Sequence, residues 1–207
     1  MKGVILIVSN NIKGPSEKEK DYCKKGHQDD LIIRTLLKKE LVNEKTEYVI
    51  DIDQDGFFRK IDIDLILYNK NGRLATIEVK ADGFPSIRNN KKYVFLELIS
   101  NSKKYQESNQ KDGLGCILTS RAHYFIFYFI LYDYYLIINS QKLRQFIKEN
   151  KDKYEKKQAR TFSPDNKSIW YYSEGILVPV MDLVSIGGIV KKSRYKYLDI
   201  KKELKID

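Results

Sequence analysis

The chain has 207 residues, of which 42% are hydrophobic and 32% charged; this composition fits a globular protein with a full core and excludes a disordered one. A formal net charge of +10 favours a polyanionic partner, nucleic acid first and an anionic membrane surface second. A genome rich in A/T, which enriches Lys, Asn, Ile and Tyr, is the alternative source of that charge.

Cysteine usage and hydropathy predict a cytoplasmic protein without a membrane segment. Cys23 and Cys116 lie far apart, without the spacing of a metal knuckle or a disulfide framework, which indicates reduced, buried thiols. The apolar run Val4–Ser9 is too short for a signal-peptide core and predicts a first strand. The apolar segment Tyr124–Ile138 is interrupted by Asp133 and is shorter than a bilayer span.

A helix is expected after the Gly14-Pro15 break. Ser16 and Glu19 form a candidate capping box at its start, and Gly26 is a point where the helix could divide into two pieces. The apolar positions expected to form its buried stripe are Ile33, Leu36, Leu37 and Leu41. Asp30 precedes this stripe by about a turn, where a charge near a helix N-terminus is one interpretation.

A strand is predicted over residues 47–52, followed by a turn over 53–56. Asp51, Asp53 and Asp55 with Gly56 resemble a calcium loop, but Asp62 stands where an EF-hand needs Glu, so turn chemistry explains these residues. Arg59 and Lys60 follow, well placed for phosphate contacts.

The central stretch, residues 59–80, predicts a β-hairpin. Strands are expected over Ile61–Tyr68 and Leu74–Lys80, joined at Asn71-Gly72. A three-residue loop with Gly72 in the left-handed conformation pairs Asn69 with Arg73 and sets Asp64 opposite Glu78. A two-residue loop would turn Asp64 to the other face. The three-residue loop is preferred because it gathers the apolar side chains on one face, namely Ile61, Ile63, Leu65, Leu67, Ala75, Ile77 and Val79.

The preferred register places acidic and basic side chains together. Asp62, Asp64, Glu78 and Lys80 would line one face, where two opposed carboxylates favour a hard divalent cation between them. The carbonyl of Val79 could add an oxygen, and the Lys80 ammonium could orient a water or offset charge on a phosphate. An exposed hairpin with ordinary cross-strand charge pairs is the alternative interpretation.

Asp64, thirteen intervening residues and then Glu78-Val79-Lys80 resemble the catalytic signature of the PD-(D/E)XK nuclease superfamily. With the flanking elements, the resemblance covers roughly residues 16–150. It implies an α/β (α+β) fold with a restriction-endonuclease-like core, a central mixed β-sheet flanked by helices. No Pro precedes Asp64, and Asp62 competes with it for the first acidic position. No Gln-x-x-x-Tyr follows Lys80, unlike the RecB-type branch.

The resemblance also implies that the helix before the hairpin contributes an acid, and Gly26-x-x-x-Asp30 matches that arrangement. Glu40, near the apolar face of the same helix, is its rival. After Lys80 a loop leads to a strand over 93–100. There Glu97 would lie near the metal if this strand pairs beside residues 75–80, or would face the surface as a normal alternation position.

The rest of the chain is expected to complete the nuclease core and add an extension. Lys103 and Lys104 belong to a polar, basic segment at 101–113 that could contact nucleic acid or form a solvated surface. Strands are predicted over 124–131 and 134–139, with a helix over 140–150. We expect the core to span 1–150, a linker 151–168, and a C-terminal strand and basic extension packed on the core 169–207, whose tail is a nucleic-acid-binding arm or a short packing helix.

These features predict a metal-dependent DNA endonuclease that hydrolyses phosphodiester bonds. Asp64, Glu78 and the Val79 carbonyl would bind Mg²⁺ or Mn²⁺, and Lys80 would assist the attacking water. Asp30, Asp62 and Glu97 rank second, and Arg59, Lys60, Lys103 and Lys104 are the expected nucleic-acid contacts. DNA is the expected partner, with a homodimer if two strands are cut, and no small-molecule cofactor is expected. The alternatives are a Holliday junction resolvase acting on branched DNA and a non-catalytic basic nucleic-acid-binding protein.

Overall fold

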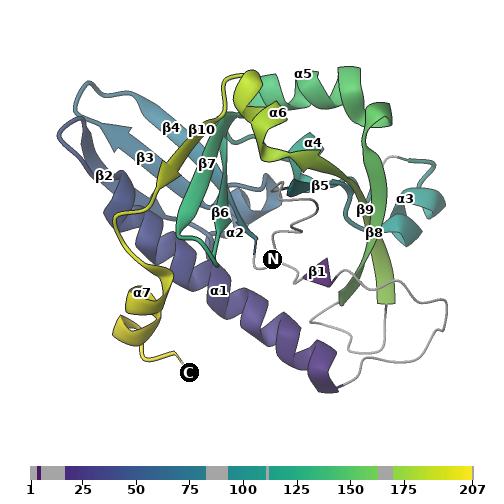
Figure 1. The fold of residues 1–207 in the computed structure, drawn as a ribbon, viewed down its shortest axis with the longest axis horizontal. Helices are drawn as coiled ribbons and strands as arrows, with labels where there is room; N and C mark the ends of the chain where they lie inside the picture. The colour runs from purple at the N-terminus through teal and green to yellow at the C-terminus, as the bar shows by residue number, and fades with distance from the viewer. Residues whose placement is uncertain (1–3, 6–16, 83–92, 111, 163–169, 207) are drawn as a thin grey trace.

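The computed structural model of the chain describes residues 4–5, 17–82, 93–110, 112–162 and 170–206 (Figure 1). In chain order, its strands and helices are β1 (Val4–Ile5), α1 (Glu17–Leu41), β2 (Thr46–Asp51), α2 (Gly56–Lys60), β3 (Leu65–Asn69), β4 (Leu74–Asp82), β5 (Tyr93–Ile99), α3 (Ser102–Glu107), α4 (Cys116–Thr119), β6 (Tyr124–Phe129), β7 (Tyr134–Asn139), α5 (Ser140–Asn150), the 3₁₀ turn η1 (Lys151–Lys153), β8 (Glu155–Phe162), β9 (Trp170–Pro179), α6 (Val180–Ser185), β10 (Ile189–Lys192) and α7 (Tyr197–Glu203).

A six-stranded mixed sheet carries the central hairpin. Its strand order is β10-β7-β6-β4-β3-β2, and β4 runs parallel to β6 while the other paired strands of this sheet are antiparallel. A parallel pair needs a long crossover connection, and here β5, α3 and α4 lie in the chain between β4 and β6. The expected mixed α/β architecture, a central mixed sheet flanked by helices, is confirmed (Figure 1).

Helix α1 covers one face of this sheet. The predicted stripe is correct: Ile33, Leu36 and Leu37 are fully buried and Leu41 packs at the margin of the same cluster. On the sheet side the cluster contains alternate hairpin residues, among them Leu65 and Val79, as a half-buried sheet face requires. The helix continues through Gly26 without a break, and Ser16 lies outside the described residues.

A second, antiparallel sheet has the order β1-β8-β9-β5. Its β5 and β9 pack with β6, β7, α5 and α6 around a second core that includes Leu96, Phe127, Leu143 and Ile176. The expectation that the strand with Glu97 could pair beside β4 is therefore wrong. Strand β4 already has β3 and β6 as its neighbours, and β5 pairs with β9 instead.

The linker expected over 151–168 is wrong for residues 155–162. These residues form β8, which pairs with β9 along its whole length, from Glu155 opposite Leu177 to Phe162 opposite Trp170. The stretch resembles a linker because Glu155, Lys156 and Gln158 are polar and exposed, while Ala159 is fully buried. Residues 163–168 lie outside the described residues.

The C-terminal part contacts both the mixed sheet and helix α1. Strand β10 pairs with β7 at one edge of the mixed sheet, and α7 packs against α1 with Tyr197 and Ile200 buried (Figure 1). The tail is therefore a packing helix, one of the two alternatives that its sequence allowed. Within the described ranges, no helix is both long enough and apolar enough to span a bilayer.

Candidate active site

The hairpin has the predicted three-residue loop. Residues Leu65 to Tyr68 pair with Ile77 to Leu74, the amide of Asn69 donates to the Arg73 carbonyl at 3.1 Å, and Gly72 has a φ of 73°. Only a residue that tolerates the left-handed region fits that position without strain. The last pair of this register is Leu65 with Ile77, so the next position along sets Asp64 opposite Glu78, where the charge of Asp64 acts to raise the pKa of Glu78.

The two acids lie where β3 and β4 part. Pairing between these strands begins at Leu65, whereas β4 continues beside β6 as far as Asp82. The Val79 amide therefore lies on the side of β4 where β3 no longer pairs, and it donates to Asp64 Oδ2 at 2.7 Å. The side chain of Asp64 thus takes over a bond of the strand ladder and is held in a fixed, buried position, 5% exposed.

Glu78 is buried against Lys80. Lys80 Nζ lies 2.6 Å from Glu78 Oε1, while the side chain of Glu78 is 3% exposed and that of Lys80 is 25% exposed. Glu78 Oε2 is buried and has no hydrogen-bond partner among the described residues. A buried carboxylate oxygen without a donor is costly, so this atom is available to a proton, a cation or a ligand donor.

Electrostatics in the cluster are dominated by burial. Desolvation raises the pKa of Glu78 to about 8, against the attraction of Lys80 and with the repulsion of Asp64. Desolvation likewise raises the pKa of Asp64, although Lys80 and the Val79 amide oppose the shift. Burial would lower the pKa of Lys80, but Cys116, Glu78 and Asp64 outweigh it and hold that pKa well above its ordinary value. The ammonium is therefore charged at every physiological pH, and the acids compete for a neutralising partner.

Helix α1 brings Asp30 to the same cluster. Asp30 lies in the interior of α1 rather than at its N-terminus, so the interpretation as a helix-terminal charge is wrong. It is 7% exposed, and desolvation raises its pKa to about 7, while Lys80 and Arg34 act against the shift and Asp64 adds to it. Asp30 therefore lies within the electrostatic reach of Lys80 and Asp64.

Sequence reasoning missed Arg34, one helical turn after Asp30. Its guanidinium contacts Asp51 at 3.3 Å and Asp53 at 3.0 Å, and its side chain is 6% exposed. This buried cation lowers the pKa of both Asp30 and Asp64. The i, i+4 spacing from Asp30 was the available signal.

Cys116 was expected to be only a buried thiol. It is free and buried, as expected, while the Cys23 side chain lies outside the described part of the chain. Burial raises the pKa of the Cys116 thiol above its ordinary value, and the Lys80 ammonium acts against that shift. Cys116, at the start of α4, therefore borders the Lys80 side of the cluster.

The two rivals of the predicted acids have other partners. Asp62, at a φ of 51°, accepts a bond from Thr119 Oγ1 at 2.8 Å, whereas Asp64 is the acid that accepts a bond from β4. Glu40 accepts bonds from the Arg194 amide at 2.9 Å, from Ser193 Oγ and from Tyr135 Oη. Glu40 therefore anchors the C-terminal segment and does not join the cluster.

Glu97 comes from the second sheet, where it stands opposite Gly175 on β9. Its charge contributes to the raised pKa of Cys116, as do the charges of Glu78 and Asp62. Glu97 therefore influences the cluster only through its charge, and it does so from the second sheet.

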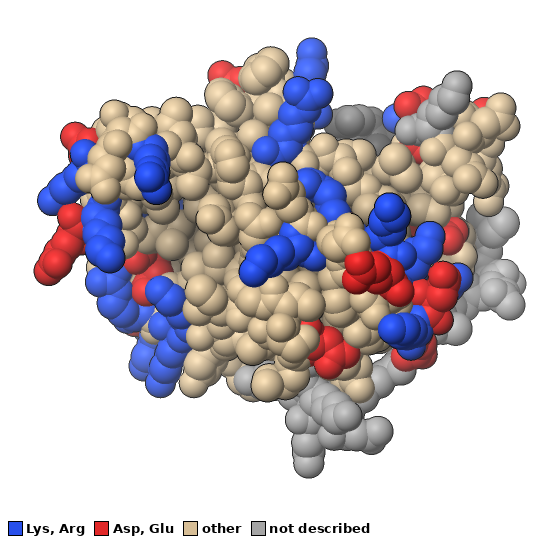
Figure 2. All heavy atoms as spheres, turned by 90° about the horizontal axis from the view of Figure 1, so that it is seen from above, with Lys and Arg blue, Asp and Glu red and all other residues tan. Residues whose placement is uncertain are grey.

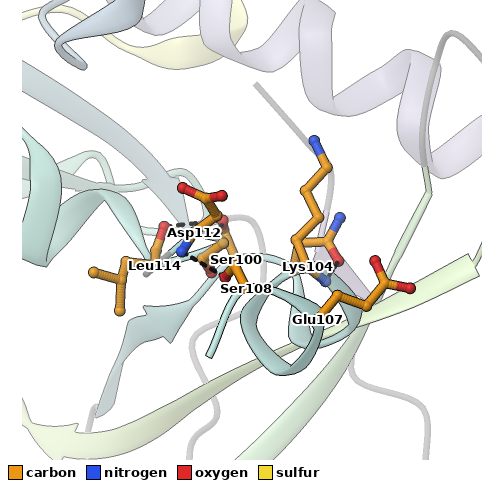
Figure 3. Close-up of a pocket in the computed structure, with 8 residues that line it drawn as sticks. Ser100, Lys104, Glu107, Ser108, Asp112 and Leu114 are labelled. Carbon is orange, nitrogen blue, oxygen red and sulfur yellow. Dashed lines mark hydrogen bonds between the residues drawn. The ribbon is translucent and has the colours of Figure 1, made fainter. Parts of the chain in front are cut away.

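The predicted nucleic-acid contacts lie on two short helices. Arg59 and Lys60 are exposed on α2, which is capped by Asp55, and Lys103 and Lys104 are exposed on α3. Lys104 also lines a hollow of about 560 Å³ beside α3, together with Glu107 and Asp112 (Figure 3). The acids in its lining disfavour phosphate, and none of Asp30, Asp64, Glu78 or Lys80 lines it.

The fit of a divalent cation to the cluster is partial. Within the described residues, no group of three or more His, Cys, Asp and Glu side chains is arranged to hold a metal ion. The unpartnered Glu78 Oε2 and the opposed Asp64 are nevertheless the hard oxygen donors that Mg²⁺ and Mn²⁺ take. Waters and backbone carbonyls commonly complete such sites.

Comparison with known proteins gives no relative on which to base a function: no family model, no curated protein and no solved structure matches the chain. What the fold and the cluster define is a mixed α/β protein with three buried acids gathered around one lysine.

Proposed function

We propose that this protein is a metal-dependent DNA endonuclease of the PD-(D/E)XK type, with a restriction-endonuclease-like core and Asp64, Glu78 and Lys80 at its active site. The observation that carries the proposal is the pair of opposed, buried carboxylates with an ammonium 2.6 Å from one of them. The burial of two acids is unfavourable for folding, and buried acids with shifted pKa values cluster at functional sites.

Asp64, Glu78 and the Val79 carbonyl are the groups that would hold Mg²⁺ or Mn²⁺. The bound cation would polarise a phosphoryl oxygen and lower the pKa of a water molecule. Such a cation would be held by two carboxylates and completed by waters and substrate phosphate, which is the usual manner of Mg²⁺.

The chain's own residues prepare the site for a phosphodiester. The Val79 amide fixes the rotamer of Asp64, and the Glu78 carboxylate fixes the position of the Lys80 ammonium. That ammonium can donate to a phosphate oxygen or to the attacking water and stabilise the negative charge of the transition state. Arg59 and Lys60, exposed on the helix that precedes the hairpin, would contact the DNA backbone.

The test is Mg²⁺-dependent cleavage of single-stranded, duplex and four-way-junction DNA by the wild type, Glu78→Gln and Lys80→Met. We expect each substitution to reduce the cleavage rate by about a hundredfold or more, with an unchanged circular dichroism spectrum. The matched control is the Lys39–Glu203 pair, which has the same 2.6 Å separation but is exposed. Lys39→Met and Glu203→Gln should therefore cleave at the wild-type rate.

The outcomes separate the alternatives. Binding without cleavage, or cleavage that survives both substitutions, would overturn the nuclease and favour a basic nucleic-acid-binding protein, which the net charge of +10 supports. Preference for the four-way junction over linear duplex would assign the enzyme to the resolvase type.

A further inference from the structure

The hairpin carries a second feature on the same face of the sheet as Glu78. Tyr48, Tyr68 and Leu74 stand opposite one another across β2, β3 and β4, and Ile50 stands opposite Ile66 in the next row. We call these five residues the open face. Tyr48 is 43% exposed, Ile50 44% and Leu74 60%. Exposed apolar side chains in adjacent rows of one sheet face form a patch that suits a binding partner.

Two aromatic rings form the centre of the open face. The rings of Tyr48 and Tyr68 are stacked, with centroids 4.9 Å apart and planes inclined by 15°. The stack holds both rings in place, since each restricts the other's rotation, and Tyr48 remains close to half exposed. A preordered, exposed ring is a platform on which a planar group can extend the stack without a further ordering cost.

The open face leads directly to the candidate active site. Side chains alternate along a strand, so Tyr68, Ile66 and Asp64 share one face of β3, and Leu74, Thr76 and Glu78 share the same face of β4. Tyr68 lies four positions after Asp64, a path of about 13 Å along the strand. A flexible ligand lying on the tyrosines would therefore extend along this sheet face towards the place where Asp64 and Glu78 lie.

Cations border the open face. Lys45 and Lys70 are exposed at the end of the sheet nearest the tyrosines, where the Lys70 amide donates to the Lys45 carbonyl at 3.1 Å. Arg121 is exposed near the other end, with its amide bonded to the Ile61 carbonyl at 3.0 Å. Figure 2 shows Lys and Arg side chains gathered at the end of the molecule where β2, β3 and β4 lie in Figure 1, beside fewer acidic ones.

We propose that the open face binds unpaired bases of a DNA strand and leads that strand to Asp64 and Glu78. The occupant follows from its chemistry: stacked aromatic rings bind base faces, and the bordering cations bind phosphates. Bases inside a duplex are already stacked on each other, so the platform selects a single strand or a single-stranded flap. The part of the inference that concerns cleavage rests on the proposed function, whereas the binding itself does not.

The experiment measures binding of fluorescent dT₂₀ to the full chain by anisotropy, in EDTA and at low salt, for Tyr48→Ala, Tyr68→Ala and their Phe counterparts. We expect each Ala variant to weaken binding by about fivefold or more and each Phe variant to bind within about twofold of the wild type. Tyr124→Ala is the matched control, because Tyr124 is similarly exposed, at 38%, but stands beside Ile77 on the other face of the sheet.

Three results would overturn the inference. The first is unchanged dT₂₀ affinity in both Ala variants, and the second is tighter wild-type binding of duplex or of rU₂₀ than of dT₂₀. The third is a wild-type dimer that Tyr48→Ala disrupts without loss of dT₂₀ binding, which would make a second copy the occupant. Tyrosine-dependent binding with no cleavage would support this inference and refute only the nuclease, whereas cleavage with tyrosine-independent binding would do the reverse.

Discussion

The Asp64 carboxylate accepts a hydrogen bond of 2.7 Å from the Val79 amide, at the point where β3 stops pairing with β4. One side chain therefore closes the sheet ladder and also presents a carboxylate opposite Glu78. These two roles predict different effects for two substitutions at position 64.

Asp64→Asn should retain the fold, because an amide oxygen can still accept from Val79. Asp64→Ala leaves a buried amide without an acceptor, which costs about 1–3 kcal/mol. We therefore expect the Ala variant to be less stable than the Asn variant by about that amount in urea unfolding, while both lose cleavage. Equal stability of the two variants would show that water satisfies the amide.

The raised pKa of Asp30 predicts a pH dependence of stability. Its pKa is about 7 in the folded protein and 3.8 in the unfolded chain, so the folded state retains a proton that the unfolded state releases between these values. The contribution of Asp30 is fully present below pH 3.8 and is lost as the pH rises through about 7. Wild-type stability, measured in EDTA, should fall between pH 5 and pH 8.

Asp30→Asn is the matched variant, because it keeps the neutral shape at every pH. We expect it to reduce the loss of stability between pH 5 and pH 8 by at least about 1 kcal/mol. A slope identical to that of the wild type would mean that another group carries the titration.

Binding of Mg²⁺ should stabilise the fold independently of catalysis. At a concentration a hundred times Kd, a ligand that binds only the folded state adds about 2.7 kcal/mol, or about 5–10 °C in the melting temperature of a domain of this size. Glu78→Gln should lose most of this rise, while Glu203→Gln should keep it. The proposed metal ligands would be refuted by an equal rise in all three proteins.

Glu40 predicts a purely structural effect. Its buried carboxylate binds the amide of Arg194 and the hydroxyls of Ser193 and Tyr135, and so holds the segment that leads to α7. Glu40→Ala should lower the free energy of unfolding by about 2–3 kcal/mol, because it leaves several donors unpaired. Per folded molecule, cleavage should be unchanged; a specific loss of rate would place Glu40 in the active site after all.

The local features of the site follow from short stretches of sequence. Gly72 favours a tight loop, the apolar alternation selects the register that sets Asp64 opposite Glu78, and the alternation of β4 puts Lys80 on the same face as Glu78. The stripe around Leu36 and Leu37 likewise follows from helical periodicity. These predictions succeed because turn chemistry and side-chain alternation act over a few residues.

The errors concern segments whose state depends on distant partners. Residues 155–162 have the composition of a linker, and they form β8 because β9 offers a strand with which to pair. The role of Asp30 was ambiguous because its place in the helix depends on where α1 begins. Only the packing of α1 on the sheet brings Asp30 towards Lys80. The neighbour of the strand with Glu97 could not be predicted, since strand order is a global property.

The sequence by itself was enough to predict the opposition of Asp64 and Glu78, because the apolar alternation of the two strands selects one of the registers that the tight turn allows. Only the tertiary structure decided what surrounds that pair, because burial and charge depend on elements that lie far apart in the chain. Helix α1 supplies Asp30 and Arg34, α4 supplies Cys116, and the parting of β3 from β4 makes the place that Asp64 fills.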